Sequence, residues 1–129
     1  MKQSFARRVA MSAILAAGLY STIPSVVQAH ATLVKCTITV GATYRSAPKT
    51  VTCTFAEGVN PKGSFIGVFQ ATGDKGEVDK QDSSVPFTNA KQLTVGLPSL
   101  ARGSYNLIWF TISANDGHRA GGYFTFAVK

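Results

Sequence analysis

Hydrophobic and polar residues alternate with a period of two over most of the chain after residue 31, and turn-forming residues interrupt the alternation at short intervals. The pattern predicts strands at residues 32–40, 50–55, 64–70, 92–97, 105–113 and 123–128, with an exposed loop or hairpin at residues 72–84. We therefore expect an all-β domain of about seven strands, a small Greek-key β-sandwich.

Two of the predicted strands suggest where the core lies. In residues 32–40 the side chains of Val34, Cys36, Ile38 and Val40 share one face, which we expect to be buried. Residues 105–113 are apolar on both faces, which predicts a central strand that is covered on both sides.

The first 29 residues have the three parts of a secretory signal peptide: a basic start, an apolar stretch from Val9 to Tyr20, and small residues before a cleavage site after Ala29. An uncleaved anchor helix is the alternative. We predict residues 1–29 as a cleaved signal and residues 30–129 as a single exported domain. No other stretch reaches the roughly 18 apolar residues that a membrane helix needs.

The charge and the cysteines limit the partners and sites that the protein can have. Three of the 13 basic residues lie in the signal and all six acidic residues lie outside it, so residues 30–129 carry a net charge of +4. The basic residues are scattered, which argues against a nucleic-acid partner. Cys36 and Cys53 predict a disulfide in an exported protein, with a thiolate metal site as the alternative.

The chain has two histidines, and both occupy informative positions. Cleavage after Ala29 makes His30 the first residue of the mature protein, where its α-amine and imidazole form a bidentate nitrogen chelate. His118 follows Asp116 and Gly117 in the loop before the last strand, and in an extended segment residues i and i+2 project to the same side. Three nitrogens and one carboxylate oxygen suit Cu(II), so we predict one Cu(II) held by His30, Asp116 and His118.

These segments resemble the CopC family of periplasmic copper-resistance proteins. The resemblance rests on the sequence HATL from His30, on VTCTFAEGV at residues 51–59, on LPSLARGSY at residues 97–105, and on SANDGH followed by GGYFTF near the C-terminus. It implies a cupredoxin-like β-sandwich, a periplasmic location, a role in copper resistance, storage or delivery, and an inner-membrane copper transporter of the CopD type as partner. Glu57 matches an acidic position of the family and is a candidate partner for a copper ligand.

The chain departs from some family members in having no methionine outside the signal, because its two methionines are Met1 and Met11. Soft ligands for Cu(I) are therefore absent from the mature protein. One alternative is a copper monooxygenase-like enzyme with the same nitrogen chelate, and another is a β-sandwich interaction domain without a metal. We expect no enzymatic activity, because the carboxylate fills a position that catalytic metal sites keep open.

Overall fold

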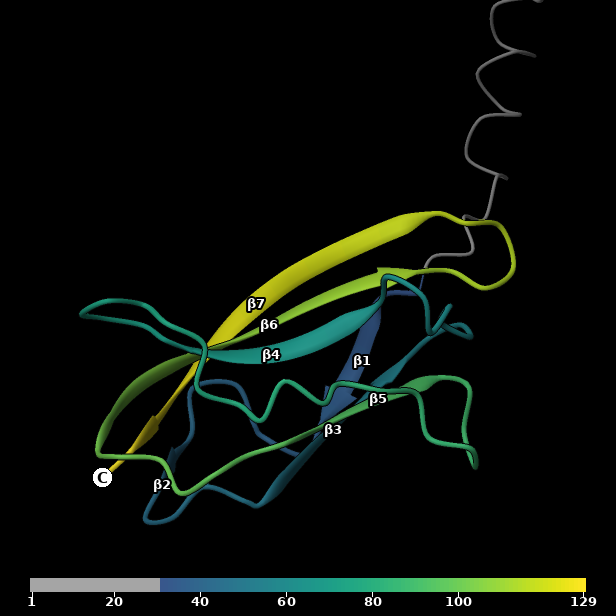
Figure 1. Ribbon diagram of the computed structural model, residues 1–129. Helices are drawn as coiled ribbons and strands as arrows, with labels where there is room; N and C mark the ends of the chain where they lie inside the picture. The colour runs from purple at the N-terminus through teal and green to yellow at the C-terminus, as the bar shows by residue number, and fades with distance from the viewer. Residues whose placement is uncertain (1–30) are drawn as a thin grey trace, which may run out of the picture.

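The computed structural model describes residues 31–129 as two β-sheets packed face to face, with no helix among these residues (Figure 1). The predicted signal and His30 lie outside the described residues. One sheet has the strand order β1-β3-β5 and the other β2-β7-β6-β4. The strands are β1 (Leu33–Cys36), β2 (Thr43–Tyr44), β3 (Thr50–Phe55), β4 (Phe65–Gln70), β5 (Gln92–Gly96), β6 (Gly103–Ile112) and β7 (Arg119–Val128). The prediction of a seven-stranded all-β sandwich is confirmed.

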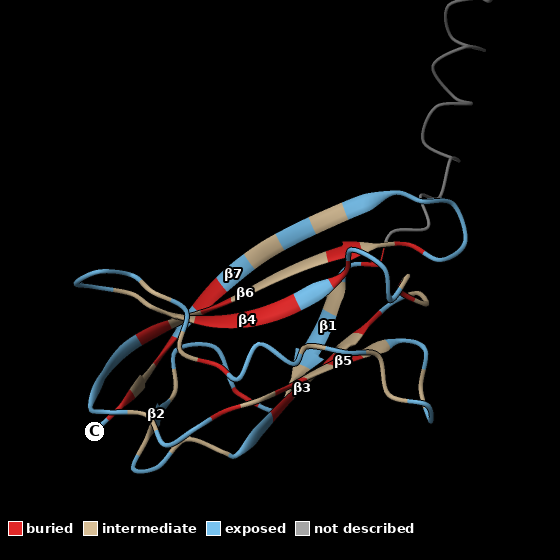
Figure 2. Ribbon diagram, viewed as in Figure 1, coloured by how far each residue is buried: buried red, intermediate tan, exposed pale blue. Residues whose placement is uncertain are grey.

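The core lies between the sheets, and the buried residues of β3, β5, β6 and β7 fall at alternate positions along each strand (Figure 2). β3 and β5 alternate strictly between buried and more exposed positions, because one face of each strand packs against the opposite sheet. The fully buried side chains include Val51, Phe55, Leu93, Val95, Ile66, Val68, Leu107 and Phe126. No helix within residues 31–129 is long and apolar enough to cross a membrane.

Cys36 and Cys53 face each other in the β1–β3 ladder and are joined by a disulfide. In the chain-entropy account, closing a loop of this length stabilises the fold by about 3 kcal/mol. The described residues contain no free cysteine, which removes the alternative of a thiolate metal site there.

The first strand is shorter than the sequence predicted. β1 ends at Cys36, and a register shift between Leu33 and Lys35 turns the intervening residue away from the core. Val34 and Val40 are 61% and 68% exposed, so the prediction that both are buried is wrong. A second strand, β2, lies between residues 40 and 50, where the sequence predicted no strand.

The prediction for β6 is correct in one respect and wrong in another. β6 is central within its sheet, because it pairs with β4 on one side and with β7 on the other. Only its inner face is covered by the second sheet, whereas Ile108 and Phe110 on the outer face are only half-buried. The strand is therefore not covered on both sides, and apolar residues remain at the surface.

The β6–β7 hairpin gives the molecule two distinct ends. Its ladder runs without interruption from the Gly103–Val128 pair to the Ile112–Arg119 pair. The loop that closes the hairpin lies at one end of the sandwich, and the C-terminus lies at the other (Figure 1). A ladder of this length fixes the position of the loop, which contains Asp116 and His118.

Candidate metal centre

The loop between β6 and β7 is a tight turn. The amide of Ser113 donates to the carbonyl of His118 at 2.8 Å, and the amide of Gly117 donates to the carbonyl of Ser113 at 3.0 Å. Gly117 has a φ of +72°, a conformation that residues with a side chain rarely adopt. Asp116 and His118 therefore come together through a turn, and the expectation that they lie on an extended segment is wrong.

Two contacts join Asp116 to His118. The backbone amide of His118 donates to Oδ1 of Asp116 at 3.0 Å, and Nδ1 of the imidazole lies 2.7 Å from Oδ2. The His118 side chain is 57% exposed and that of Asp116 is 32% exposed, so an ion can reach both from solvent. One carboxylate thus fixes both the backbone and the ring of the same histidine.

Hydrogen bonds keep Asp116 ionised. The amide hydrogen bond from His118, followed by the contact with its imidazole ring, lowers the pKa of the Asp116 carboxyl to about 2. A hydrogen bond from Ser113, which is buried beneath the loop, lowers it further. Near neutral pH the loop therefore presents a carboxylate and an imidazole side by side.

The segment that follows β3 supports this loop from the other sheet. Nδ2 of Asn115 donates to Oε2 of Glu57 at 3.0 Å, and the amide of Ala114 donates to the carbonyl of Gly58 at 2.9 Å. Val59 and Ser113 form an isolated β-bridge. Glu57, which the family resemblance suggested as a partner of a copper ligand, contacts the residue before Asp116 and so helps to position the loop.

The beginning of the described chain lies next to the same loop. Ala31 is fully buried, and its carbonyl accepts a hydrogen bond of 2.6 Å from Oγ1 of Thr111, which is also fully buried. The carbonyl of Thr32 accepts a hydrogen bond from the amide of Ala56 at 2.9 Å. β1 pairs with β3 in the opposite sheet, and Ala31 reaches β6 across the sandwich.

Ala31 directly follows His30, the predicted third ligand, which lies outside the described residues. Within residues 31–129 no cluster of three or more His, Cys, Asp or Glu side chains could hold a metal ion. The described part of the chain therefore offers two donors at this end of the sandwich, and a complete copper site needs others.

Oδ2 of Asp116 and Nδ1 of His118 lie 2.7 Å apart, the distance of a hydrogen bond between a carboxylate and an imidazole. This contact holds the two side chains together at the surface of the loop. Thr111 and Ser113 also belong to this centre, although the sequence analysis did not identify them. Only the alternation that continues from Thr111 in β6 to Ser113 just after it, which turns both side chains inward, could have indicated their place.

Comparisons with known proteins point in the same direction. The model of the CopC domain family matches residues 33–129. The protein YobA of Escherichia coli K12 is 37% identical over 111 residues, which cover 84% of this chain and 86% of YobA. The copper transport protein CutJ of Bacillus subtilis is 31% identical over 107 residues. That match covers 82% of this chain but only 19% of CutJ, which is a much longer protein.

Solved structures show the same architecture. CopC from Methylosinus trichosporium OB3b superposes with a TM-score of 0.69 at 29% identity, covering 78% of this chain and 94% of that one. The methionine-rich copper resistance protein PcoC from Escherichia coli superposes with a TM-score of 0.65 at 23% identity, covering 78% of this chain and all of PcoC. At that lower identity the second likeness concerns the fold alone.

Proposed function

This chain belongs to the CopC family, and from that premise we propose that its exported form binds one Cu(II) ion through His30, Asp116 and His118. The relatives named above include a copper transport protein, and with the CopC family match a copper-related function follows for this chain. The finer proposal is that this protein holds Cu(II) for resistance, storage or delivery.

The observation that carries the proposal is the pairing of Asp116 with His118 at the end of the sandwich that Ala31 also reaches. In the proposed site His118 supplies one imidazole nitrogen and Asp116 one carboxylate oxygen. His30 supplies its α-amine and its imidazole. Three nitrogens and one oxygen form the donor set that Cu(II) favours in tetragonal geometry, whereas Cu(I) prefers softer ligands.

The proposal requires export and cleavage after Ala29. Only a chain that begins at His30 has a free α-amine on the residue that also provides an imidazole. CopC family proteins are generally periplasmic copper proteins, which supports a periplasmic location for this one. Residues 1–29 accordingly act as the signal peptide, and residues 30–129 form the copper-binding domain.

CopC family proteins are copper-binding and copper-resistance proteins rather than enzymes, and this chain is likewise not an enzyme. The alternative of a monooxygenase is therefore set aside. In the proposed site the carboxylate of Asp116 fills a position that a catalytic copper centre keeps open for its substrate.

Delivery of copper needs a recipient. The match to CutJ supports an inner-membrane copper transporter of the CopD type, because a segment similar to this chain is there part of a longer copper transport protein.

Mass spectrometry of the protein purified from the cell envelope tests the proposal. The expected result is a chain that begins at His30 and binds one copper ion, which Zn(II) and Ni(II) in tenfold excess do not displace, as the order of metal affinities predicts. An envelope protein that starts at another residue, or one that binds no copper, contradicts the proposal.

A further inference from the structure

Residues 76–84, which we call the strap, cover an edge of each sheet. β4 is an edge strand of one sheet and β5 an edge strand of the other, and the two strands lie in contact. The amide of Gln70 on β4 donates to the carbonyl of Gly76 at 2.9 Å. At the other end of the strap, Ser84 and Thr94 on β5 exchange two hydrogen bonds of 2.9 Å. One segment therefore covers two strand edges that would otherwise be open to another extended chain.

Side chains bind the middle of the strap to β4. The amide of Ile66 donates to Oγ of Ser83 at 2.9 Å. The amide of Val68 donates to Oδ2 of Asp79 at 2.8 Å, and Oδ1 of the same carboxylate accepts the amide of Gln81 at 2.7 Å. Gln81 has a φ of +58°, which residues with a side chain rarely adopt. Both oxygens of Asp79, which is only 8% exposed, therefore hold the strap in its conformation on β4.

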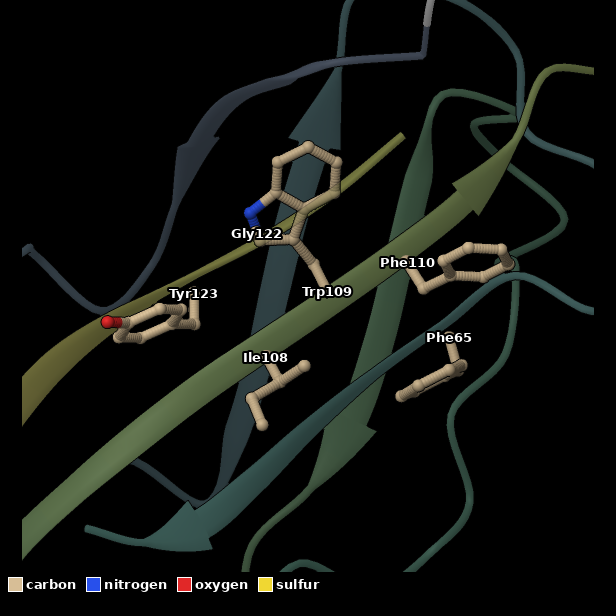
Figure 3. A pocket seen from close by; sticks show the side chains of 6 residues that line it. All are labelled: Phe65, Ile108, Trp109, Phe110, Gly122 and Tyr123. Atoms are coloured by element: carbon tan, nitrogen blue, oxygen red, sulfur yellow. The ribbon is translucent and has the colours of Figure 1, made fainter. Parts of the chain in front are cut away.

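A gap in the outer face of β4 receives this carboxylate. Phe65, Gly67 and Phe69 occupy successive positions on that face, and Figure 3 shows Phe65 on the outer face of the sheet. A Cβ added at Gly67 would lie 3.2 Å from Oε1 of Glu77 and 3.3 Å from Oδ2 of Asp79. It would also lie 2.9 Å from the ring of Phe69. The glycine thus leaves room for two carboxyl groups beside an aromatic ring, and we call Glu77 and Asp79 the carboxyl pair.

The two carboxyl groups of the pair interact directly. Partial desolvation raises the pKa of the Glu77 carboxyl, and a hydrogen bond with Asp79 and repulsion from its charge raise this pKa further. Glu77 therefore takes up a proton at a higher pH than an ordinary glutamate does. Protonated Glu77 donates to Asp79, whose ionised carboxylate has enough lone pairs to accept this hydrogen bond as well as those of its two backbone amides.

No cationic side chain within residues 31–129 forms a salt bridge with the carboxyl pair. Lys80 and Asp82 of the strap face β5, because a Cβ added at Gly96 would lie 3.0 Å from Cδ of Lys80 and 3.1 Å from Oδ2 of Asp82. Lys75 lies in the turn before the strap and is exposed. β4 and β5 carry no titratable side chain, and that of β6, Tyr105, is buried in the core. Repulsion between the two carboxylates is therefore relieved by a proton.

We propose that the carboxyl pair is a pH-sensitive switch that holds the strap on β4 when it carries one proton and loosens the strap when it carries none. With one proton, Glu77 donates to Asp79 and adds a hydrogen bond within the strap. Without it, two negative charges face each other over Gly67. Because folding raises the pKa of Glu77, the stabilisation is absent near neutral pH and grows as the pH falls through that pKa. Opening of the strap exposes the amides of Ile66 and Val68 at the edge of β4.

Amide hydrogen exchange, followed by NMR on the exported protein purified without metal, tests the proposal. The protection of the Val68 and Gln81 amides, corrected for the intrinsic pH dependence of exchange, is compared with protection in the middle of the β6–β7 ladder. We expect protection at Val68 and Gln81 to rise about threefold or more between about pH 7 and pH 5, while protection in the ladder stays constant. Protection at Val68 that does not change with pH, or that changes in parallel with the ladder, overturns the proposal.

Two substitutions separate the switch from an ordinary contact. Glu77→Gln has the shape of the protonated acid, and its amide can donate to Asp79 at any pH. We expect protection at Val68 to be independent of pH in this variant and to equal that of the native protein at about pH 5. The control Asp74→Asn changes a carboxylate that accepts the amide of Gly76 in the turn before the strap, and it should keep the native pH dependence. A Glu77→Gln protein with the native pH dependence, or a control that loses it, contradicts the switch.

Discussion

Asp74 and Asp116 make the same local hydrogen bond with different consequences. Oδ1 of Asp74 accepts a hydrogen bond from the amide of Gly76 at 3.0 Å, and Oδ1 of Asp116 accepts one from the amide of His118, also at 3.0 Å. In each turn the acceptor lies two residues before the donor, as turn-forming aspartates commonly do. The backbone hydrogen bond is therefore common to both turns and does not by itself make a metal site.

The two turns differ in the residue two positions after the aspartate, which is Gly76 in one and His118 in the other, and in what surrounds them. Residue 76 is a glycine, so no side chain there can contact the second carboxylate oxygen of Asp74. At residue 118, in contrast, the imidazole lies 2.7 Å from Oδ2 of Asp116. The loop of Asp116 is also tied to the segment after β3 and lies at the end that Ala31 reaches. A turn with an ordinary backbone thus becomes a candidate copper site through one histidine and its neighbours.

Substitutions at the residue two positions after each aspartate should have the largest effect on copper binding. His118→Ala removes an imidazole ligand, and we expect Cu(II) affinity to fall by more than the roughly 100-fold that loss of a ligand's hydrogen-bond partner can cost. The reverse change, Gly76→His, recreates the Asp-x-His pattern far from Ala31, and we expect the protein still to bind one copper per chain. Competition titration with a chelator measures both. Full affinity in His118→Ala, or a second tight site in Gly76→His, contradicts the comparison.

Neutralising the carboxylate should have the next largest effect. Asp116→Asn retains an acceptor for the amide of His118 but removes the charge that faces the metal, so we expect Cu(II) affinity to fall about 10- to 100-fold. The substitution should also change acid stability. Because the folded-state pKa of Asp116 is depressed to about 2, its contribution to stability is present above pH 4 and is lost as the pH falls through about 2.

Chemical denaturation of the copper-free protein between pH 2 and pH 5 measures that contribution. The difference in free energy of unfolding between the native protein and Asp116→Asn should shrink toward pH 2. A difference that stays constant over this range would show that the carboxylate is not held by the contacts described above.

Loosening the contact between β6 and Ala31 should have a smaller effect on copper. Thr111→Val removes the hydroxyl that donates to the buried carbonyl of Ala31 and should destabilise the fold by about 1–3 kcal/mol. We expect a severalfold loss of Cu(II) affinity, because the residue after His30 loses its attachment near the metal loop. Thr111→Ser, which keeps the hydroxyl, should restore most of that affinity. If the valine and serine variants bind copper equally, the hydrogen bond has no part in the site.

Removing the disulfide should affect stability alone. Cys36 and Cys53 join β1 to β3 in the sheet opposite the metal loop, and the double substitution to alanine should lower the free energy of unfolding by about 3 kcal/mol. Copper affinity should stay within a factor of two of the native value at a temperature where both proteins are folded. A large loss of copper would indicate that the cysteines support the site directly.

The sequence predicted those features that repeat along the chain or lie close together in it. β3 and β5 were predicted because one face of each strand is buried and the other is not, which produces a clear alternation. The outer face of β6 led to a wrong prediction, because Ile108 and Phe110 are apolar but lie at the surface. Their residue types therefore did not indicate their burial.

The candidate site was only partly predictable for a similar reason. Asp116 and His118 are two residues apart, so their pairing could be proposed, although a turn and not an extended segment brings them together. The hydrogen bond between Thr111 and Ala31 joins residues 80 positions apart through a side chain and a carbonyl. Such a contact has no periodicity, and only the packing of the two sheets reveals it.

The most direct test of the central claim compares the protein that begins at His30 with the same protein carrying one additional glycine before it. The extra residue converts the α-amine of His30 into an amide while leaving Asp116, His118 and the sandwich unchanged. If His30 is the ligand that completes the pair in the loop, Cu(II) affinity measured by chelator competition should fall at least about 100-fold. Equal affinity in the two proteins would contradict the account.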